Sequence, residues 1–214
     1  MTAKFILYGS PHSQFTYKVA LMLMLTGSDF EFRHVSFRKG AQSTPEFRAL
    51  SRWGQVPVLQ HGETVLLQSG AILEFLAELT QKFTSSDPAE QRHIREWLYW
   101  STDRLAPPVY RLYGFWLGKN RLLPIEVDAA VENFFQRRLA AEFAVLDSEL
   151  SQRNFLVGTR PTIADICCYG DVVFAALGGI ELNRWTNVGN WLRRIAALAD
   201  LPSPSELLPA ETIL

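Results

Sequence analysis

The hydrophobic pattern of this 214-residue chain changes near residue 84. Before that point, short apolar or alternating runs typical of strands are interleaved with segments of helical length. After residue 88 no run has a strand pattern, and apolar residues recur at helical spacing. A polar, turn-rich stretch from Thr84 to Pro88 separates the two parts. A chain patterned in this way is expected to fold as two domains, the first α/β and the second all-α.

The first part predicts the order strand, helix, strand, helix, strand, strand, helix. The expected strands are 4–8, 30–35, 56–60 and 64–67, and the expected helices are 14–25, 44–50 and 71–77. Thr44 followed by Pro45 is typical of a helix start. The turn residues His61-Gly62-Glu63 indicate a hairpin between the last two strands.

The second part predicts helices over 90–117, 127–150, 162–177 and 187–198. Pro107 and Pro108 must kink or break the first of these. The third is apolar nearly all round, so it is expected to be buried. Thr162, with Asp165 three residues later, predicts a variant of the capping box, and replacing either is expected to cost about 1 kcal/mol of stability.

Composition excludes several classes of protein. The chain has 21 Lys and Arg against 22 Asp and Glu, so it lacks the basic surplus of a nucleic-acid-binding protein. Its longest unbroken apolar run, Val19 to Leu25, is far shorter than the roughly 18 residues of a membrane span, and no secretory signal pattern is present. We therefore expect a cytoplasmic protein without nucleic-acid or membrane partners. The four histidines lack metal-ligand spacing, so no metal site is expected.

The turn between the first strand and the first helix contains Ser10, His12 and Ser13. A helix N-terminus carries free N–H groups and a partial positive charge, so it favours an anion or a thiolate, to which a hydroxyl can donate a hydrogen bond. The alternative is simple capping, with Ser10 as the N-cap and Pro11 at the first helical position.

Two further turns could bind a ligand. If the Val56–Pro57 bond is cis, the Val56 N–H and C=O are exposed for pairing with the backbone of a ligand; the alternative, favoured by frequency, is a trans proline at a strand start. Gln68 and Ser69, directly before the third helix, could hold a carboxylate, with capping again as the alternative.

Together and in this order, these motifs resemble those of the cytosolic glutathione S-transferase family, and the resemblance covers nearly the whole chain. Besides the serine-containing turn, it rests on the segments Pro45–Leu50, Gly54–Leu59, Gln68–Leu73, Phe155–Gly158 and Pro161–Asp165. The resemblance implies a thioredoxin-like, glutathione-binding N-terminal domain over residues 1–83. It also implies an all-helical C-terminal domain over residues 89–214.

The resemblance further implies that glutathione is a co-substrate. Ser13, followed by Lys18-Val19, matches the serine-type, bacterial-like members and would stabilise the glutathione thiolate, with Ser10 as the second choice. Val56, in a cis bond with Pro57, would pair with the cysteinyl unit.

The remaining contacts implied for glutathione come from polar side chains. Gln68 and Ser69 would hold the γ-glutamyl group, although many members have Glu where this chain has Gln68. Gln42 and Gln55, with Lys39, would lie at the glycyl end. The electrophile would occupy a pocket between the domains, with walls formed by His12, Phe37, Tyr110, Tyr113 and Trp116.

The leading functional hypothesis is a glutathione transferase that acts on apolar electrophiles as a homodimer. One alternative is a glutathione-dependent reductase of disulfides or peroxides, and another is a non-catalytic binding protein that kept the fold. The only cysteines are the adjacent Cys167 and Cys168, which form no disulfide framework and are expected to pack inside a helix. With no cysteine in the first domain, the reactive sulfur must come from the ligand.

Overall fold

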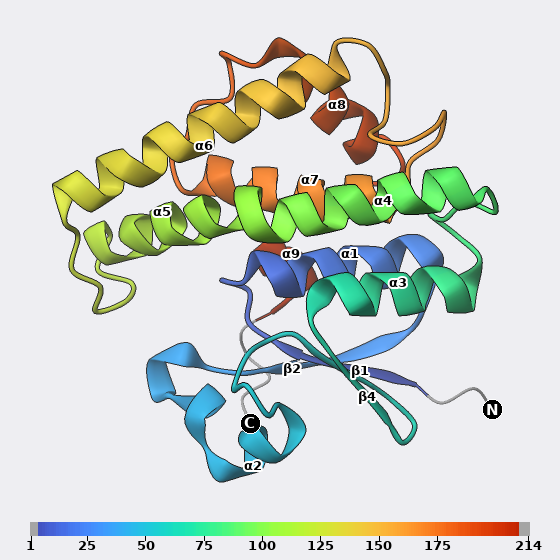
Figure 1. Cartoon of the computed structure of the whole chain (residues 1–214). Coiled ribbons are helices and arrows are strands. Elements are labelled where there is room, and N and C mark those ends of the chain that lie inside the picture. The colour runs from blue at the N-terminus through green and yellow to red at the C-terminus, as the bar shows by residue number, and fades with distance from the viewer. Residues whose placement is uncertain (1–3, 210–214) are drawn as a thin grey trace. The chain divides into compact units, whose positions relative to one another are not determined.

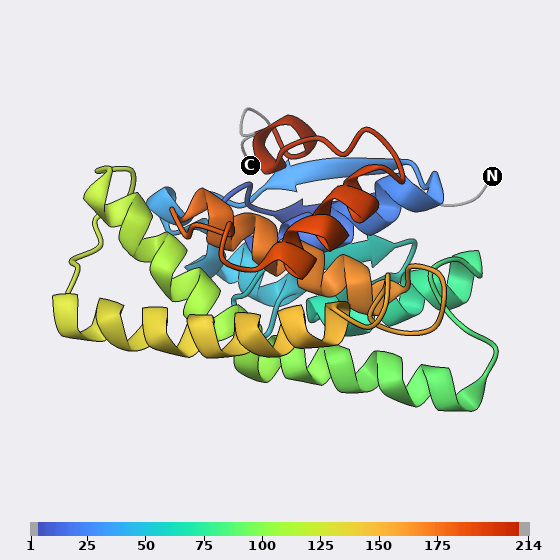
Figure 2. The same cartoon turned by 90° about the horizontal axis from the view of Figure 1, so that it is seen from above.

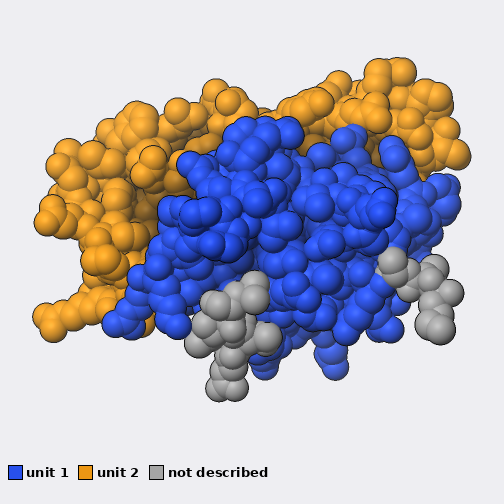
Figure 3. Space-filling view, turned by 90° about the horizontal axis from the view of Figure 1, so that it is seen from below, with its two compact units in different colours: residues 1–82, 199–214 blue, residues 83–198 orange. Residues whose placement is uncertain are grey.

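The computed structural model describes residues 4–209 and divides the chain into two compact units (Figure 3). Unit 1 is Met1–Lys82 with Ala199–Leu214, and unit 2 is Phe83–Leu198. The first boundary lies at the turn-rich stretch of the sequence. The last segment groups with unit 1, which differs from our expectation of a helical domain running to residue 214.

Unit 1 contains a four-stranded sheet in the order β2-β1-β3-β4. The strands are β1 (Phe5–Gly9), β2 (Phe30–His34), β3 (Val58–His61) and β4 (Thr64–Leu67). Strand β1 runs parallel to β2 and antiparallel to β3, and β3 and β4 form the expected hairpin with His61 opposite Thr64. This is the thioredoxin-like arrangement implied by the resemblance.

Helices cover both faces of this sheet. They are α1 (Gln14–Thr26), α2 (Pro45–Leu50) and α3 (Ser69–Thr80), with short 3-10 turns η1 (Phe37–Lys39) and η2 (Ala41–Ser43). Helices α1 and α3 pack together on one side, and α2 lies on the other (Figure 1). Phe47 of α2 packs there with Tyr8 and Val58, so one apolar side chain anchors the short helix to the sheet.

The segment after Ala199 adds the short helix α9 (Pro204–Leu207), which packs on α1. Tyr17 explains part of this attachment. Its side chain is buried, and its hydroxyl donates to the carbonyl oxygen of Pro202 at 2.8 Å. A buried phenol needs a hydrogen-bond partner, and the returning chain supplies one.

Unit 2 is all-helical. Its helices are α4 (Pro88–Trp100), α5 (Ala106–Lys119), α6 (Ala129–Leu150), α7 (Ile163–Leu177) and α8 (Thr186–Ala196). Helix α7 contacts α4, α5 and α8 and is buried along nearly its whole length, as its apolar sequence predicted (Figure 2). Cys167 and Cys168 form no disulfide and are buried on this helix, which confirms the expectation that they pack. Within residues 4–209, no helix has both the length and the apolar character needed to cross a membrane.

The two consecutive prolines interrupt the first long helix, as predicted. A π-helical turn, η3 (Ser101–Leu105), separates α4 from α5, and the N–H of Ala106 donates to the carbonyl of Ser101. Pro107 and Pro108 therefore lie in the first turn of α5, where a missing N–H leaves no helical hydrogen bond unmade. Figure 2 shows α5 leaving the line of α4 at this point.

The start of α7 confirms the predicted capping box. Asp165 accepts hydrogen bonds from the N–H of Thr162 and Leu156, both at 2.9 Å, and from Nε1 of Trp191 at 2.9 Å. Burial raises the pKa of this carboxyl group, and the hydrogen bonds act in the opposite direction. Asp165 thus joins a loop, α7 and α8, which a local capping motif alone does not indicate.

Candidate functional site

The candidate binding turns of unit 1 all leave the sheet at one end. In the strand register Gly9 lies opposite His34, Tyr8 opposite Val58, and Val58 opposite Leu67. The carboxyl ends of β1, β2 and β4 therefore meet the amino end of β3. The turns that hold Ser13, Gln42, Val56 and Ser69 start from this common edge (Figure 1).

Ser13 is the N-cap of α1. Its Oγ accepts a hydrogen bond from the N–H of Thr16 at 3.2 Å, and its side chain is 7% exposed. The first turn of α1 contains no acidic residue, so its partial positive charge is not neutralised locally. Within residues 4–209 we find no hydrogen bond in which the Ser13 hydroxyl acts as donor, so its proton is available to a ligand.

Ser10 does not cap α1. The alternative prediction, with Ser10 as the N-cap, was therefore wrong. Its hydroxyl accepts from the N–H of His12 at 3.2 Å, and the residue is only 1% exposed. Its own N–H donates to Oγ1 of Thr16 at 3.3 Å. Ser10 therefore fixes the turn from inside, and the helix begins three residues later because Ser13 provides the cap.

Tyr8, another side chain that could activate a thiol, faces the opposite end of the sheet. Its hydroxyl accepts from Nη1 of Arg33 at 2.9 Å and donates to Oε1 of Gln60 at 3.3 Å. Because Gln60 lies opposite Ile6, the phenol points back along β1, away from the turns described above.

His12 lies on the surface of the Ser10–Ser13 turn. Desolvation by burial of part of the ring, and then the neighbouring His34, hold the pKa of His12 below its usual value of 6.5. Its imidazole is therefore neutral at pH 7, directly beside Ser13.

The Val56–Pro57 bond is cis, as the resemblance implied. The turn that carries it approaches the turn at Gln42 closely. Gly54 has φ 61°, and a Cβ built on it would lie 2.9 Å from the Gln42 carbonyl oxygen. Glycine is required here both for its backbone conformation and for the close contact.

Gln68 and Ser69 form the start of α3. Gln68 has φ 70° and makes no capping hydrogen bond with its side chain, so capping does not account for it. Its Nε2 instead donates to Oε1 of Gln55 at 3.3 Å, which joins two of the predicted glutathione-binding residues. A non-glycine residue at positive φ is uncommon and often marks a functional site.

No pattern in the sequence indicates Ser51, whose side chain contacts the residue before Val56. Its hydroxyl donates to the carbonyl of Gln55 at 2.9 Å and accepts from the N–H of Gln55 at 3.1 Å. In sequence, a serine at the end of a short helix has the appearance of an ordinary C-cap. Only the contacts within the fold distinguish it.

The residues expected around the electrophile belong to both units. His12 and Phe37 are in unit 1, and Tyr110, Tyr113 and Trp116 are on α5 in unit 2. Tyr113 and Trp116 stack with ring centroids 5.9 Å apart, and burial raises the pKa of Tyr113 to about 12. Tyr110 is 42% exposed. The row thus contains both packed and accessible rings.

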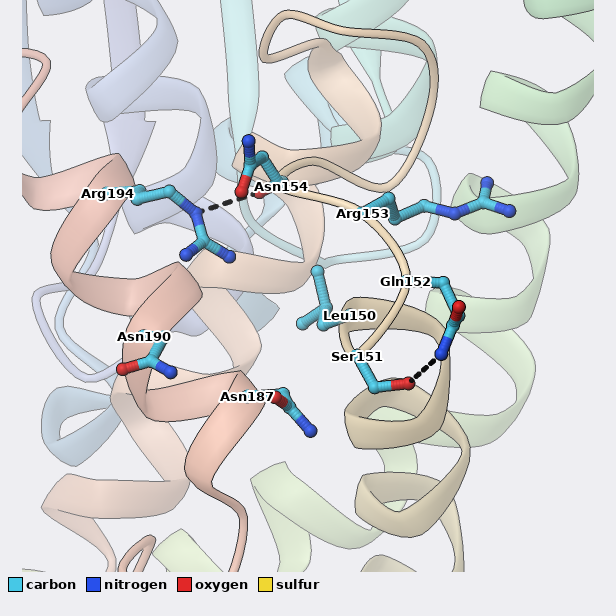
Figure 4. A pocket seen from close by; sticks show the side chains of 8 residues that line it. All are labelled: Leu150, Ser151, Gln152, Arg153, Asn154, Asn187, Asn190 and Arg194. Carbon is cyan, nitrogen blue, oxygen red and sulfur yellow. Dashed lines mark hydrogen bonds between the residues drawn. The ribbon is translucent and has the colours of Figure 1, made fainter.

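Unit 2 also has a polar hollow of about 270 Å³ between the end of α6 and α8 (Figure 4). Its two arginines already have partners within the chain. Nε of Arg194 donates to the carbonyl of Asn154 at 3.1 Å, and Nη2 of Arg153 lies 3.6 Å from a carboxylate oxygen of Glu149. Figure 4 shows Arg153 directed away from the other labelled side chains. The hollow therefore does not gather reactive groups as the turns of unit 1 do.

Comparison with known proteins assigns both parts of the chain. The family model for the glutathione S-transferase N-terminal domain matches residues 3–78, and the model for the C-terminal domain matches residues 126–194. Disulfide-bond oxidoreductase YfcG of Escherichia coli (strain K12) is 31% identical over 186 residues, which cover 84% of each chain.

Two further relatives carry the family name. Glutathione S-transferase 3 of Zea mays is 33% identical over 162 residues, covering 74% of this chain and 72% of that protein. A crystal structure of a glutathione S-transferase from Xanthobacter autotrophicus Py2 superposes with a TM-score of 0.85 at 29% identity, covering 97% of this chain and 98% of that one. The serine-capped helix, the cis Val56–Pro57 turn and these matches together show that the chain belongs to the glutathione S-transferase family.

Proposed function

We propose that this protein is a glutathione transferase in which the Ser13 hydroxyl stabilises the glutathione thiolate for attack on an apolar electrophile. The observation that carries the proposal is the position of Ser13. It caps α1 through its oxygen, and its proton is left to donate to an anion at the positive end of the helix.

The energetics suit this role. A free thiol with a pKa of about 8.5 is only a few per cent ionised at pH 7. A hydroxyl hydrogen bond together with the helix dipole lowers that pKa by roughly one to two units, at about 1.4 kcal/mol per unit. The thiol proton leaves to solvent. The sulfur then forms a bond to the electrophilic carbon, and the leaving group departs with the bonding electron pair.

The other turns supply binding. The Val56 backbone pairs with the cysteinyl unit, Gln68 and Ser69 hold the γ-glutamyl group, and Gln42 and Gln55 lie toward the glycyl carboxylate. These turns leave the same end of the sheet, which supports a single extended site for the tripeptide. A net charge of +2 over residues 1–84, from eight basic and six acidic side chains, suits an anionic ligand.

The second substrate, the apolar electrophile, is bound by aromatic side chains. The candidates for contacting it are His12 and Phe37 in unit 1 and Tyr110, Tyr113 and Trp116 in unit 2, whose rings suit an apolar electrophile. Homodimerisation is typical of the family, and we propose that this protein is a cytoplasmic homodimer; sedimentation equilibrium tests the oligomeric state directly.

The decisive experiment compares wild type with Ser13→Ala in the conjugation of a chromogenic aryl halide. We expect the variant to lose about 10-fold in kcat/KM at pH 7, corresponding to about one unit of thiol pKa, because the helix dipole remains. The thiolate absorbance of bound glutathione should titrate at correspondingly higher pH. Ser10→Ala tests the second-choice hydroxyl: because Ser10 fixes the turn from inside, its loss should weaken glutathione binding without raising the thiol pKa as Ser13→Ala does. Full activity with an unshifted thiol pKa in Ser13→Ala would remove Ser13 from the mechanism.

A second candidate is reduction of a disulfide by bound glutathione. The relative named as a disulfide-bond oxidoreductase favours it, and so does the position of both cysteines on buried α7, which leaves glutathione as the source of sulfur. Two glutathione molecules would be oxidised to one glutathione disulfide while the substrate disulfide gains two electrons and two protons. Assaying a small symmetric disulfide beside the aryl halide separates the two activities. Retention on immobilised glutathione without either activity would point to the non-catalytic alternative.

A further inference from the structure

The turn that presents Val56 has little regular structure to hold it. It follows α2, which ends at Leu50, and β3 begins only at Val58. The residues between them are therefore outside the sheet ladder, and their backbone groups need other partners. One such contact is made by Gly54, whose N–H donates to the carbonyl of Ser51 at 2.8 Å.

The Ser51 side chain makes the hydrogen bonds to this backbone that a neighbouring strand would otherwise make. It is 1% exposed, and its hydroxyl satisfies both backbone groups of Gln55, accepting from the N–H at 3.1 Å and donating to the carbonyl at 2.9 Å. One side chain thus fixes both peptide groups of the residue that precedes Val56. The backbone orientation of Val56 depends directly on this residue.

Gln55 then connects this turn to the start of α3. Its exposed side chain accepts a hydrogen bond from Nε2 of Gln68 at 3.3 Å, where the backbone has φ 70°. A continuous series of contacts therefore runs from Ser51 through the backbone and side chain of Gln55 to Gln68. It joins the part of the site assigned to the cysteinyl unit with the part assigned to the γ-glutamyl group.

We propose that Ser51 is a positioning residue for glutathione: it holds Gln55, and through it the Val56 backbone and Gln68, in the geometry that binds the tripeptide. The inference rests on the proposed function. Because Ser51 does not touch the reacting sulfur, it sets the affinity for glutathione and leaves the chemical step to Ser13.

The test measures binding and turnover separately. We expect Ser51→Ala to raise the Kd for S-hexylglutathione, determined by isothermal titration calorimetry, about 5- to 10-fold, since two hydrogen bonds of modest net strength are lost. The KM for glutathione should rise by the same factor, while kcat at saturating glutathione stays within about twofold of wild type.

The matched control is Thr80→Val, which removes a hydroxyl that donates to the Leu76 carbonyl within α3, remote from the turn. It should leave the Kd within twofold of wild type. Hydrogen exchange provides a readout that a general loss of stability does not mimic: Ser51→Ala should accelerate exchange at residues 52–57 without accelerating it in α1.

The outcomes separate the two proposals. A Ser51→Ala protein that binds S-hexylglutathione within twofold of wild type overturns the role of Ser51. Wild type that does not bind the compound overturns the proposed function. If Ser51→Ala does not fold, Ser51→Cys takes its place, since a thiol has a similar size and is a weaker hydrogen-bonding group.

Discussion

The helices α1 and α7 both begin with a hydroxyl side chain as N-cap, but the two caps have different surroundings. Ser13 caps α1 with its oxygen, and the first turn contains no acidic residue. Thr162 caps α7, and Asp165 in the same turn accepts three hydrogen bonds from nitrogen donors in three parts of unit 2. A helix N-terminus is available to a ligand when the chain does not neutralise it; Asp165 lies in the first turn of α7, whereas the first turn of α1 has no acidic side chain.

The largest expected loss of stability follows substitution of Asp165 at the start of α7. Asp165→Ala leaves the N–H groups of Leu156 and Thr162 and the indole N–H of Trp191 without their acceptor inside the protein. Each buried unpaired donor costs about 1–3 kcal/mol, so the free energy of unfolding should fall by roughly 3–5 kcal/mol. Urea denaturation measures it. A loss near 1 kcal/mol, as the capping motif alone predicts, would show that the wider network contributes nothing.

Gly9→Ala should disrupt the turn before α1, because the added methyl group meets the side chain of Thr16. A Cβ at Gly9 would overlap Cγ2 of Thr16, the residue whose N–H Ser13 caps. Overpacking of this kind costs about 1–3 kcal/mol and should displace the serine turn, so glutathione affinity and stability should fall together. The matched variant is Gly70→Ala, where a Cβ meets no atom within 4 Å and stability should be unchanged or improved. Normal glutathione binding by Gly9→Ala would contradict the close contact.

Removal of the two capping hydroxyls, of Ser13 and Thr162, separates an effect on stability from an effect on the thiol pKa of glutathione. Ser13→Ala and Thr162→Ala should each lower the free energy of unfolding by about 1 kcal/mol, because each removes one cap. Only Ser13→Ala should raise the pKa of bound glutathione. Thermal unfolding and a thiolate titration on the same samples compare them. Equal shifts of the thiol pKa in both variants would mean that the cap acts only through stability.

The smallest effect is the pH dependence contributed by His12. Burial and His34 lower its pKa in the folded state, so between that value and 6.5 the unfolded chain binds more protons than the folded chain. The stability contribution is therefore present above pH 6.5 and is lost as the pH falls through the folded pKa. It should be smaller than the loss from either cap variant, because the residue is exposed. Unfolding of wild type and His12→Asn between pH 7.5 and 5 measures it, and identical pH profiles would contradict the assignment.

Local patterns in the sequence predicted most of the elements. The hairpin at His61-Gly62-Glu63, the capped start of α2 at Thr44 and the interruption at Pro107-Pro108 are all present. Each depends on neighbours in the chain, which is why spacing and turn chemistry are sufficient to find it. The candidate turns lie between the predicted elements, at the common edge of the sheet.

The contacts within the site were not predictable in this way. The sequence pattern favoured Ser10 as the N-cap of α1, but Ser13 caps the helix, because the buried Ser10 hydroxyl accepts a hydrogen bond from His12 within the turn. Ser51 had no distinctive pattern, and its bonds to Gln55 appear only when the loop folds over the end of α2. The segment after Ala199 contacts α1 through Tyr17, a pairing across 185 residues that no local pattern encodes.

The sequence by itself therefore determined the types of element, their order, the division near residue 84 and the family. Those properties follow from hydrophobic period and turn residues, which act over a few neighbours. Tertiary structure alone decided which serine caps α1, which carboxylate accepts hydrogen bonds from buried donors, and which serine bonds to the backbone of Gln55. The bond from Trp191 to Asp165 joins residues distant in sequence, whereas the bonds of Ser13 to Thr16 and of Ser51 to Gln55 are local in the chain but depend on loop conformations that the surrounding fold selects.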